Sequence, residues 1–159
     1  MAETAEEVPP VIDWAIAELG VAGPLGIGGI SMGGTVAVVA AGLDPRLAAV
    51  AGGLAEGDWR RIGALYPLSA PNPYVQSCYD RSNPLSNLAH YQRRPAISFQ
   101  LGAEDRVIPP GSAQRLAEAL APAYAASPER LEVVLEGGIG HEFTEGMWQR
   151  LLAWFRRFL

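Results

Sequence analysis

One serine of this sequence stands in a pattern that is typical of an enzymatic nucleophile. Gly29-Ile30-Ser31-Met32-Gly33 matches G-x-S-x-G, and it lies between a short apolar run and a run of small residues. That context predicts a strand–turn–helix junction, which is the setting of a nucleophile elbow. Glycines suit both flanks, because a sharp turn strains the serine backbone and leaves no room for Cβ atoms. The Ser31 hydroxyl is then exposed at a helix N-terminus, where the Met32 N–H faces a developing oxyanion.

A serine hydroxyl is a weak nucleophile and needs a neighbouring base that a carboxylate orients. The sequence contains 2 histidines, and we take His141 as the base. It follows an apolar run and a glycine-rich segment, and it precedes the last predicted helix. His90 has no comparable surroundings, so we interpret it as structural.

The orienting acid is expected between the serine and the histidine in sequence, near the end of a strand. Asp105 fits that place, because it follows the apolar run 94–101. Glu104 beside it and Asp80 upstream are competing candidates. Serine, acid and histidine in this order are described for α/β-hydrolase folds.

The elements that must position these residues alternate along the chain. Apolar runs alternate with segments of helical spacing, which indicates an α/β fold with about four parallel strands flanked by helices. Side chains at the carboxyl ends of such strands meet at one edge of the sheet, where ligands bind. The predicted helices cover 8–19, 35–43, 112–124 and 143–158, and the predicted strands cover 24–30, 47–54, 94–101 and 131–136.

Residues 1–159 are expected to form a single domain with one irregular part. The segment 55–91 is rich in tyrosine and proline and lacks a clear period. Long irregular segments in compact domains are commonly lids or binding loops, so we interpret 55–91 as lid-like.

The motifs together resemble the α/β-hydrolase superfamily, and most closely its dienelactone hydrolase and prolyl-oligopeptidase-like branches. The resemblance rests on Gly-Ile-Ser-Met-Gly-Gly at 29–34, Leu-Gly-Ala-Glu-Asp-Arg-Val-Ile-Pro at 101–109, Gly-Gly-Ile-Gly-His at 137–141 and Ser-Asn-Pro-Leu at 82–85. It implies a Ser-His-Asp triad that cleaves acyl bonds without a cofactor. Dienelactone hydrolases carry cysteine where this chain has Ser31, so their lactone chemistry does not transfer directly.

The resemblance covers only the C-terminal portion of such a fold, from the helix before the elbow onward. The family's earlier strands, and the loop that supplies a second oxyanion donor, have no counterpart here. The strand 24–30 is therefore expected to be an unpaired, apolar edge, which invites pairing. We expect either a homodimer or a missing N-terminal segment to pair with it.

Composition excludes several classes of partner. With 12 basic and 17 acidic residues and a net charge of −5, the chain lacks the basic footprint of a nucleic-acid binder. Proline and glycines interrupt the uncharged stretch 19–43, so no membrane span is expected. The lone Cys78 cannot form an internal disulfide, and the N-terminus is acidic, which together favour a cytoplasmic protein.

Other chemistry is not expected from the remaining residues. Two distant histidines and one cysteine give no metal-ligand spacing, and the glycines at 26 and 28 do not continue into a dinucleotide fingerprint. Arg150, Arg156 and Arg157 on the last helix are interpreted as a solvated face.

The sequence therefore predicts a serine hydrolase that cleaves carboxylic esters or related acyl bonds. One alternative is a catalytically weak or inactive remnant that binds a small molecule or a partner chain. Within the hydrolase class, a serine peptidase is the other alternative, because the resemblance does not separate esters from amides.

Overall fold

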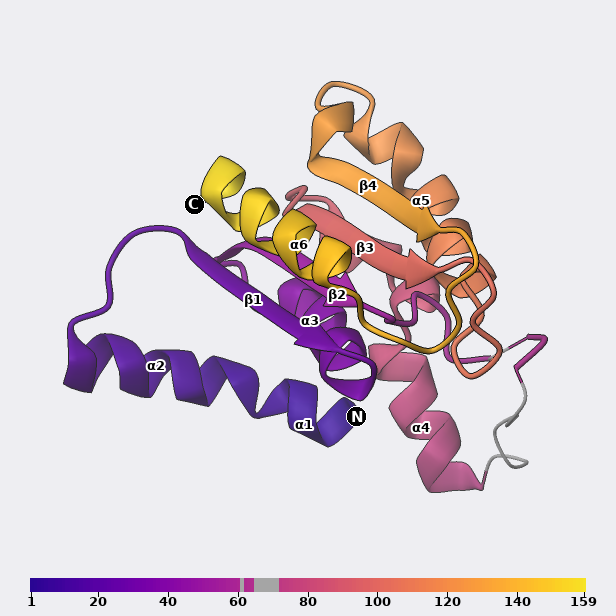
Figure 1. Cartoon of the computed structure of the whole chain (residues 1–159). Helices are drawn as coiled ribbons and strands as arrows, with labels where there is room; N and C mark the ends of the chain where they lie inside the picture. The colour runs from indigo at the N-terminus through magenta and orange to yellow at the C-terminus, as the bar shows by residue number, and fades with distance from the viewer. Residues whose placement is uncertain (61, 65–71) are drawn as a thin grey trace.

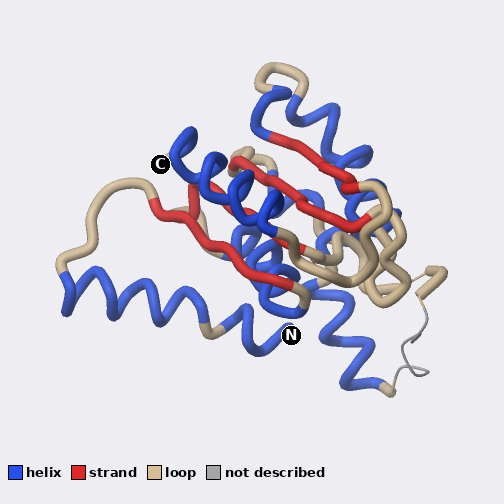
Figure 2. The backbone as a smooth tube through the Cα atoms, viewed as in Figure 1, coloured by secondary structure: helices blue, strands red, loops and turns tan. Residues whose placement is uncertain are grey.

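A parallel β-sheet with helices on both faces forms the body of the protein (Figures 1 and 2). The computed structural model describes residues 1–60, 62–64 and 72–159. The strands lie in the order β1-β2-β3-β4, and each pairs in parallel with its neighbour. The strands are β1 Leu25–Ile30, β2 Leu47–Gly53, β3 Ala96–Gly102 and β4 Leu131–Glu136. The helices are α1 Ala2–Glu6, α2 Val8–Leu19, α3 Met32–Leu43, α4 Pro73–Ser82, α5 Gly111–Tyr124 and α6 Glu145–Phe158, with short 3-10 turns at 84–86, 88–91 and 128–130.

Alternating side chains of the central strands fill two layers of core. On β2 and β3, Val50, Ile97 and Phe99 belong to the cluster that includes α3 and α5 residues. Ala49 and Ala96 belong to the opposite cluster, with residues of α6. The sheet is thus covered on both faces, which explains why its strands appear in the sequence as short apolar runs without polar alternation.

The predicted strands and long helices agree with these elements, and the α/β fold class with four parallel strands is confirmed. Gly20 ends α2 in the left-handed region, with φ 66°, and the two prolines of α2 lie in its first turn, as these residue types predict. The helix nevertheless contains no fully buried residue. Only one side of it packs against the core, through Val8 and Ile12.

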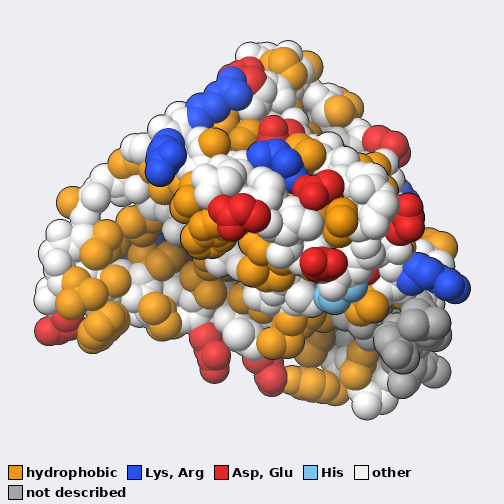
Figure 3. Space-filling view, in the orientation of Figure 1, with side chains coloured by type: hydrophobic (Ala, Val, Ile, Leu, Met, Phe, Trp, Pro, Cys, Tyr) orange, Lys and Arg blue, Asp and Glu red, His pale blue; other side chains and the backbone are white. Residues whose placement is uncertain are grey.

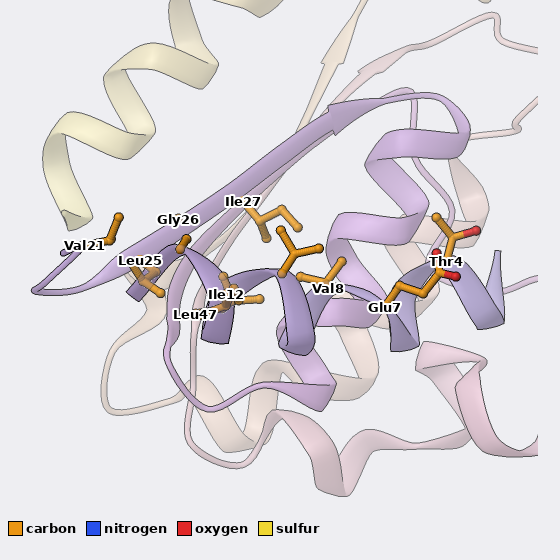
Figure 4. Close-up of a pocket in the computed structure, with 11 residues that line it drawn as sticks. Thr4, Glu7, Val8, Ile12, Val21, Leu25, Gly26, Ile27 and Leu47 are labelled. Atoms are coloured by element: carbon orange, nitrogen blue, oxygen red, sulfur yellow. The ribbon is translucent and has the colours of Figure 1, made fainter. Parts of the chain in front are cut away.

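The outer edge of β1 borders an open apolar groove. β1 pairs with β2 on one side only, so it forms one edge of the sheet that the described residues build. Between β1 and α2 lies a groove of about 450 Å³, around which Val8, Ile12, Leu25 and Ile27 are seen in Figure 4. Hydrophobic side chains also gather around the hollow beside α2 in Figure 3. The prediction of an apolar edge strand is confirmed, whereas its pairing with a second copy or a further segment stays a prediction.

The segment 55–91 is more regular than its sequence suggests. It contains α4 and two 3-10 turns, so the expectation of an irregular segment is wrong for residues 73–91. Asn72 caps α4, because its side chain accepts a hydrogen bond from the Val75 N–H, and Pro73 occupies the first helical position. Residues 61 and 65–71 of the lid-like segment lie outside the described residues, and a lid role stays a prediction.

Within the part of the chain that the structure describes, no helix has the length and apolar character needed to cross a membrane.

Candidate active site

Ser31 lies at a strained turn between β1 and α3. Its backbone has φ 55° and ψ −120°, a region that residues other than glycine rarely adopt. The Ser31 N–H donates to the carbonyl oxygen of Gly53 at 2.7 Å, which ties the turn to the end of β2. A Cβ on Gly29 would lie 2.5 Å from the Gly33 carbonyl oxygen, so Gly29 is needed for the close approach of strand and helix.

The second elbow glycine has no such steric role. A Cβ on Gly33 would meet no heavy atom within 4 Å, so the predicted lack of room is correct at Gly29 and wrong at Gly33. The backbone of Gly33 is what a side chain on Gly29 would strike. The next residue, Gly34, has less space for a side chain, since its Cβ would lie 2.8 Å from the Gly29 carbonyl oxygen.

The structure brings Ser31, His141 and Asp105 into one hydrogen-bonded chain. Ser31 Oγ lies 3.0 Å from His141 Nε2. On the other side of the ring, His141 Nδ1 lies 2.7 Å from Asp105 Oδ2. The serine and the histidine are 110 residues apart in sequence, and both are accessible to solvent at this edge of the sheet. This is the spacing at which an imidazole can take a proton from the hydroxyl while a carboxylate fixes its tautomer.

Asp105 is held by its own loop. Its side chain is only 1% exposed. Its Oδ1 accepts hydrogen bonds from the backbone N–H groups of Val107 and Ile108, both at 2.8 Å, which leaves Oδ2 for the histidine. Of the competing carboxylates, Asp80 lies on α4 and accepts from Gln76. In the structure it is therefore Asp105 that contacts the imidazole of His141 and orients it.

Close backbone packing fixes the loop that carries His141. A Cβ on Gly102, the last residue of β3, would lie 2.5 Å from the Ile139 carbonyl oxygen and closer still to that of Gly140. The Glu104 N–H donates to the same Ile139 oxygen at 2.9 Å. Gly102 thus allows the loops after β3 and β4 to touch, which places the acid beside the histidine.

Gly53 contacts both the turn that carries Ser31 and the loop that carries His141, and sequence reasoning missed it. Its carbonyl oxygen accepts the Ser31 N–H. A Cβ on Gly53 would lie 2.7 Å from Cδ2 of Phe143, so the phenyl ring, two residues after His141, packs directly on this glycine. The available signal was a pair of glycines, at 52 and 53, near the end of the predicted strand 47–54.

Met32 begins α3 directly after the serine. The first N–H groups of a helix have no acceptor within the helix, and the helix dipole favours negative charge there. The Met32 side chain is 61% exposed, so this end of the helix is open to solvent. The backbone N–H predicted to face an oxyanion is therefore at the N-terminus of a helix beside the hydroxyl.

Arg150 does more than lie on a solvated face: its side chain is 39% exposed, but it also makes hydrogen bonds that the sequence interpretation did not include. Its Nε donates to Oε1 of the buried Gln100 at 2.6 Å, and its NH2 group donates to Glu136 at 2.6 Å. Glu136 also accepts from the Thr144 hydroxyl at 3.0 Å. The hydrogen bonds from Arg150 and then Thr144 lower the pKa of the Glu136 carboxyl below its usual value of 4.5.

A family model matches the first part of the chain. The model of alpha/beta hydrolase domain containing 18 matches residues 1–90, which include the elbow. The chain belongs to this α/β-hydrolase family. Among curated proteins, none matches the chain.

Solved structures support the same fold over nearly the whole chain. TT1662 from Thermus thermophilus superposes with a TM-score of 0.76 and 24% identity, covering 97% of this chain and 61% of its own. A puromycin-hydrolyzing peptidase from Mycobacterium tuberculosis gives 0.71 and 24% identity, over 98% of this chain and 25% of its own. SOBER1 from Arabidopsis thaliana gives 0.61 and 20% identity, over 98% of this chain and 62% of its own. This chain thus spans less than two thirds of each of these proteins, and the likeness shows the fold.

Proposed function

We propose that the chain is a serine hydrolase that cleaves carboxylic esters or related acyl bonds. The observation that carries the proposal is the continuous contact from Ser31 through His141 to Asp105, with hydrogen bonds of 3.0 Å and 2.7 Å. Membership of an α/β-hydrolase family supports it as well. A buried acid, an imidazole and an accessible hydroxyl in this order are the parts that acyl transfer requires.

In the proposed reaction Ser31 Oγ attacks the acyl carbon while His141 Nε2 takes its proton. Asp105 holds the imidazole in the tautomer that has Nδ1 protonated and stabilises the imidazolium that forms. The Met32 N–H donates to the tetrahedral oxyanion. The imidazolium then protonates the leaving alcohol, which gives an acyl-enzyme, and His141 next activates a water that releases the acid.

Among the described residues we assign one oxyanion donor, the Met32 N–H, and one donor gives an incomplete oxyanion hole. Removal of one such donor typically costs about 10²- to 10³-fold in turnover. We therefore propose slow hydrolysis for the 159-residue chain, with activated esters as its best substrates.

Hydrolysis of p-nitrophenyl acetate tests the proposal. We expect turnover by the wild type that Ser31→Ala and His141→Ala each reduce to the background rate of the buffer. Equal rates for wild type and both folded variants would reject the hydrolase and favour the alternative of a non-catalytic binding module. The apolar groove between α2 and β1 is the observation that supports this alternative.

A matched pair of substrates decides between esterase and peptidase. A p-nitrophenyl ester and a p-nitroanilide that share one acyl group differ only in the leaving group. We expect the ester to be cleaved at least 10²-fold faster, because an amide leaving group demands protonation and a better stabilised oxyanion. Comparable rates would assign the site to a serine peptidase; the Mycobacterium tuberculosis neighbour is named a puromycin-hydrolyzing peptidase.

A further inference from the structure

The loop that carries His141 is intrinsically loose and must be held from outside. It connects β4 to α6 and contains Gly137, Gly138 and Gly140. Glycine has the greatest backbone freedom, so such a loop loses much conformational entropy when it is fixed in one shape. Contacts that span the loop therefore decide how well the imidazole is placed.

One carboxylate joins the two ends of this loop. Glu136 is the last residue of β4, and Thr144 is the N-cap of α6, eight positions later. The Thr144 hydroxyl donates to Glu136 Oε2 at 3.0 Å. The same hydroxyl oxygen accepts the Met147 N–H at 3.1 Å, so the bond that closes the loop also starts the helix.

The carboxylate is in turn fixed to the sheet through α6. Arg150 reaches Glu136 Oε2 at 2.6 Å with one nitrogen and Gln100 Oε1 at 2.6 Å with another. Gln100 is fully buried, and its side-chain nitrogen donates to Ser98 and Glu132. Hydrogen bonds in which the donor or the acceptor is ionised are the stronger kind, and Glu136 and Arg150 make three of them, the last to Gln100 on β3.

We propose that Glu136 is a positioning residue that holds His141 in register with Ser31 by clamping the two ends of the glycine-rich loop. It acts through the loop and touches no reacting atom. The catalytic part of this inference rests on the proposed function, whereas the placement of the imidazole does not.

Four variants test the clamp. Glu136→Ala removes the acceptor, while Glu136→Gln keeps an acceptor oxygen of the same reach. Thr144→Ala removes the other half of the clamp, and Thr144→Ser restores its hydroxyl. The control is Glu6→Ala, which breaks the Glu6–Arg81 ion pair, a contact of 2.6 Å between α1 and α4.

The kinetic readout is the split between kcat and KM for p-nitrophenyl acetate. We expect both alanine variants to lose about 10- to 100-fold in kcat with KM little changed, because a small misplacement of a catalytic group has effects of this size. The Gln and Ser variants should recover most of the loss, and the control should match the wild type. A folded Glu136→Ala variant with wild-type kcat would overturn the proposal.

A second readout works even when the wild type hydrolyses nothing. The chain has 2 histidines, so a proton–carbon NMR spectrum contains two Cε1–H ring signals, one from each imidazole, which a His90→Gln variant assigns. We expect Glu136→Ala to shift or broaden the His141 signal and to leave that of His90 unchanged. An unchanged His141 signal refutes the clamp, while loss of activity in the wild type alone refutes only the hydrolase. If Glu136→Ala fails to fold, the kinetic and NMR measurements are made on Thr144→Ala and Thr144→Ser instead.

Discussion

The contact between Gly102 and the histidine loop allows a sharp prediction for Gly102→Ala. In the present structure the added Cβ would lie 2.5 Å from the Ile139 carbonyl oxygen and closer to that of Gly140. Real Cβ atoms keep at least 3.0 Å from such atoms, so the loop must move by about 0.5 Å or more. The obstacle is backbone, which cannot rotate out of the way as a side chain can.

The expected cost has two parts. Overpacking of this kind destabilises a protein by about 1–3 kcal/mol, which corresponds to a fall of roughly 2–12 °C in Tm for a chain of this length. The shift also carries His141 away from Ser31 and Asp105, whose contacts are 3.0 Å and 2.7 Å. Displacements approaching 1 Å can lower turnover about 10²-fold. We therefore expect kcat to fall by a factor between about 10 and 100.

The assay is p-nitrophenyl acetate hydrolysis at a temperature well below the measured Tm of the variant. Gly137→Ala is the matched control, because it lies in the same loop and its Cβ would meet no heavy atom within 4 Å. We expect the control to retain wild-type kcat. A Gly102→Ala protein that is as stable and as active as the wild type would refute the reasoning that backbone contact places the histidine.

Three further predictions concern the acid, the elbow and the sheet edge. Asp105→Asn should lower kcat by about 10⁴-fold with little change in fold, as this exchange does in a Ser-His-Asp triad; a loss under tenfold contradicts the role of the carboxylate. Gly29→Ala should lower stability by about 1–3 kcal/mol in chemical denaturation, since its Cβ would lie 2.5 Å from a carbonyl oxygen; unchanged stability would show that the elbow adapts. The chain should form dimers through β1 by light scattering over a dilution series, and Ile30→Lys should weaken them, because charge on an edge strand opposes pairing. Ile62→Lys, at a site that is more exposed than Ile30 (58% against 44%), is the control, and a wild-type monomer at all concentrations would contradict the homodimer and leave only pairing with a further segment.

The regular elements that sequence reasoning found are those whose pattern reflects burial. β2 and β3 are apolar because helices cover both of their faces, and α5 shows apolar residues at helical spacing because one side faces the core. α4 was missed because most of its residues are exposed, and of its hydrophobic residues Cys78 and Tyr79 are the ones that pack against a buried cluster. Its local signals, Asn72 as N-cap and Pro73 after it, were present in the sequence.

In the candidate site, too, features set by local sequence were predictable and features set by packing were not. The elbow motif and the order of acid and histidine depend on local chemistry, so the sequence was enough to nominate Ser31, Asp105 and His141. The bond between Arg150 and Gln100 joins residues 50 positions apart, and only the packing of α6 on β3 brings them together. The steric roles of glycines also depend on which neighbour each Cα faces, which is why Gly29 was assigned correctly and Gly33 was not.

The most direct test of the central claim is covalent labelling of the folded chain by a fluorophosphonate, followed by peptide mass spectrometry. A serine that contacts an oriented imidazole should carry the phosphonate at position 31 alone, and His141→Ala should slow that labelling by at least 10²-fold. Modification that is absent from the intact protein, or equally fast without the imidazole, would contradict the account.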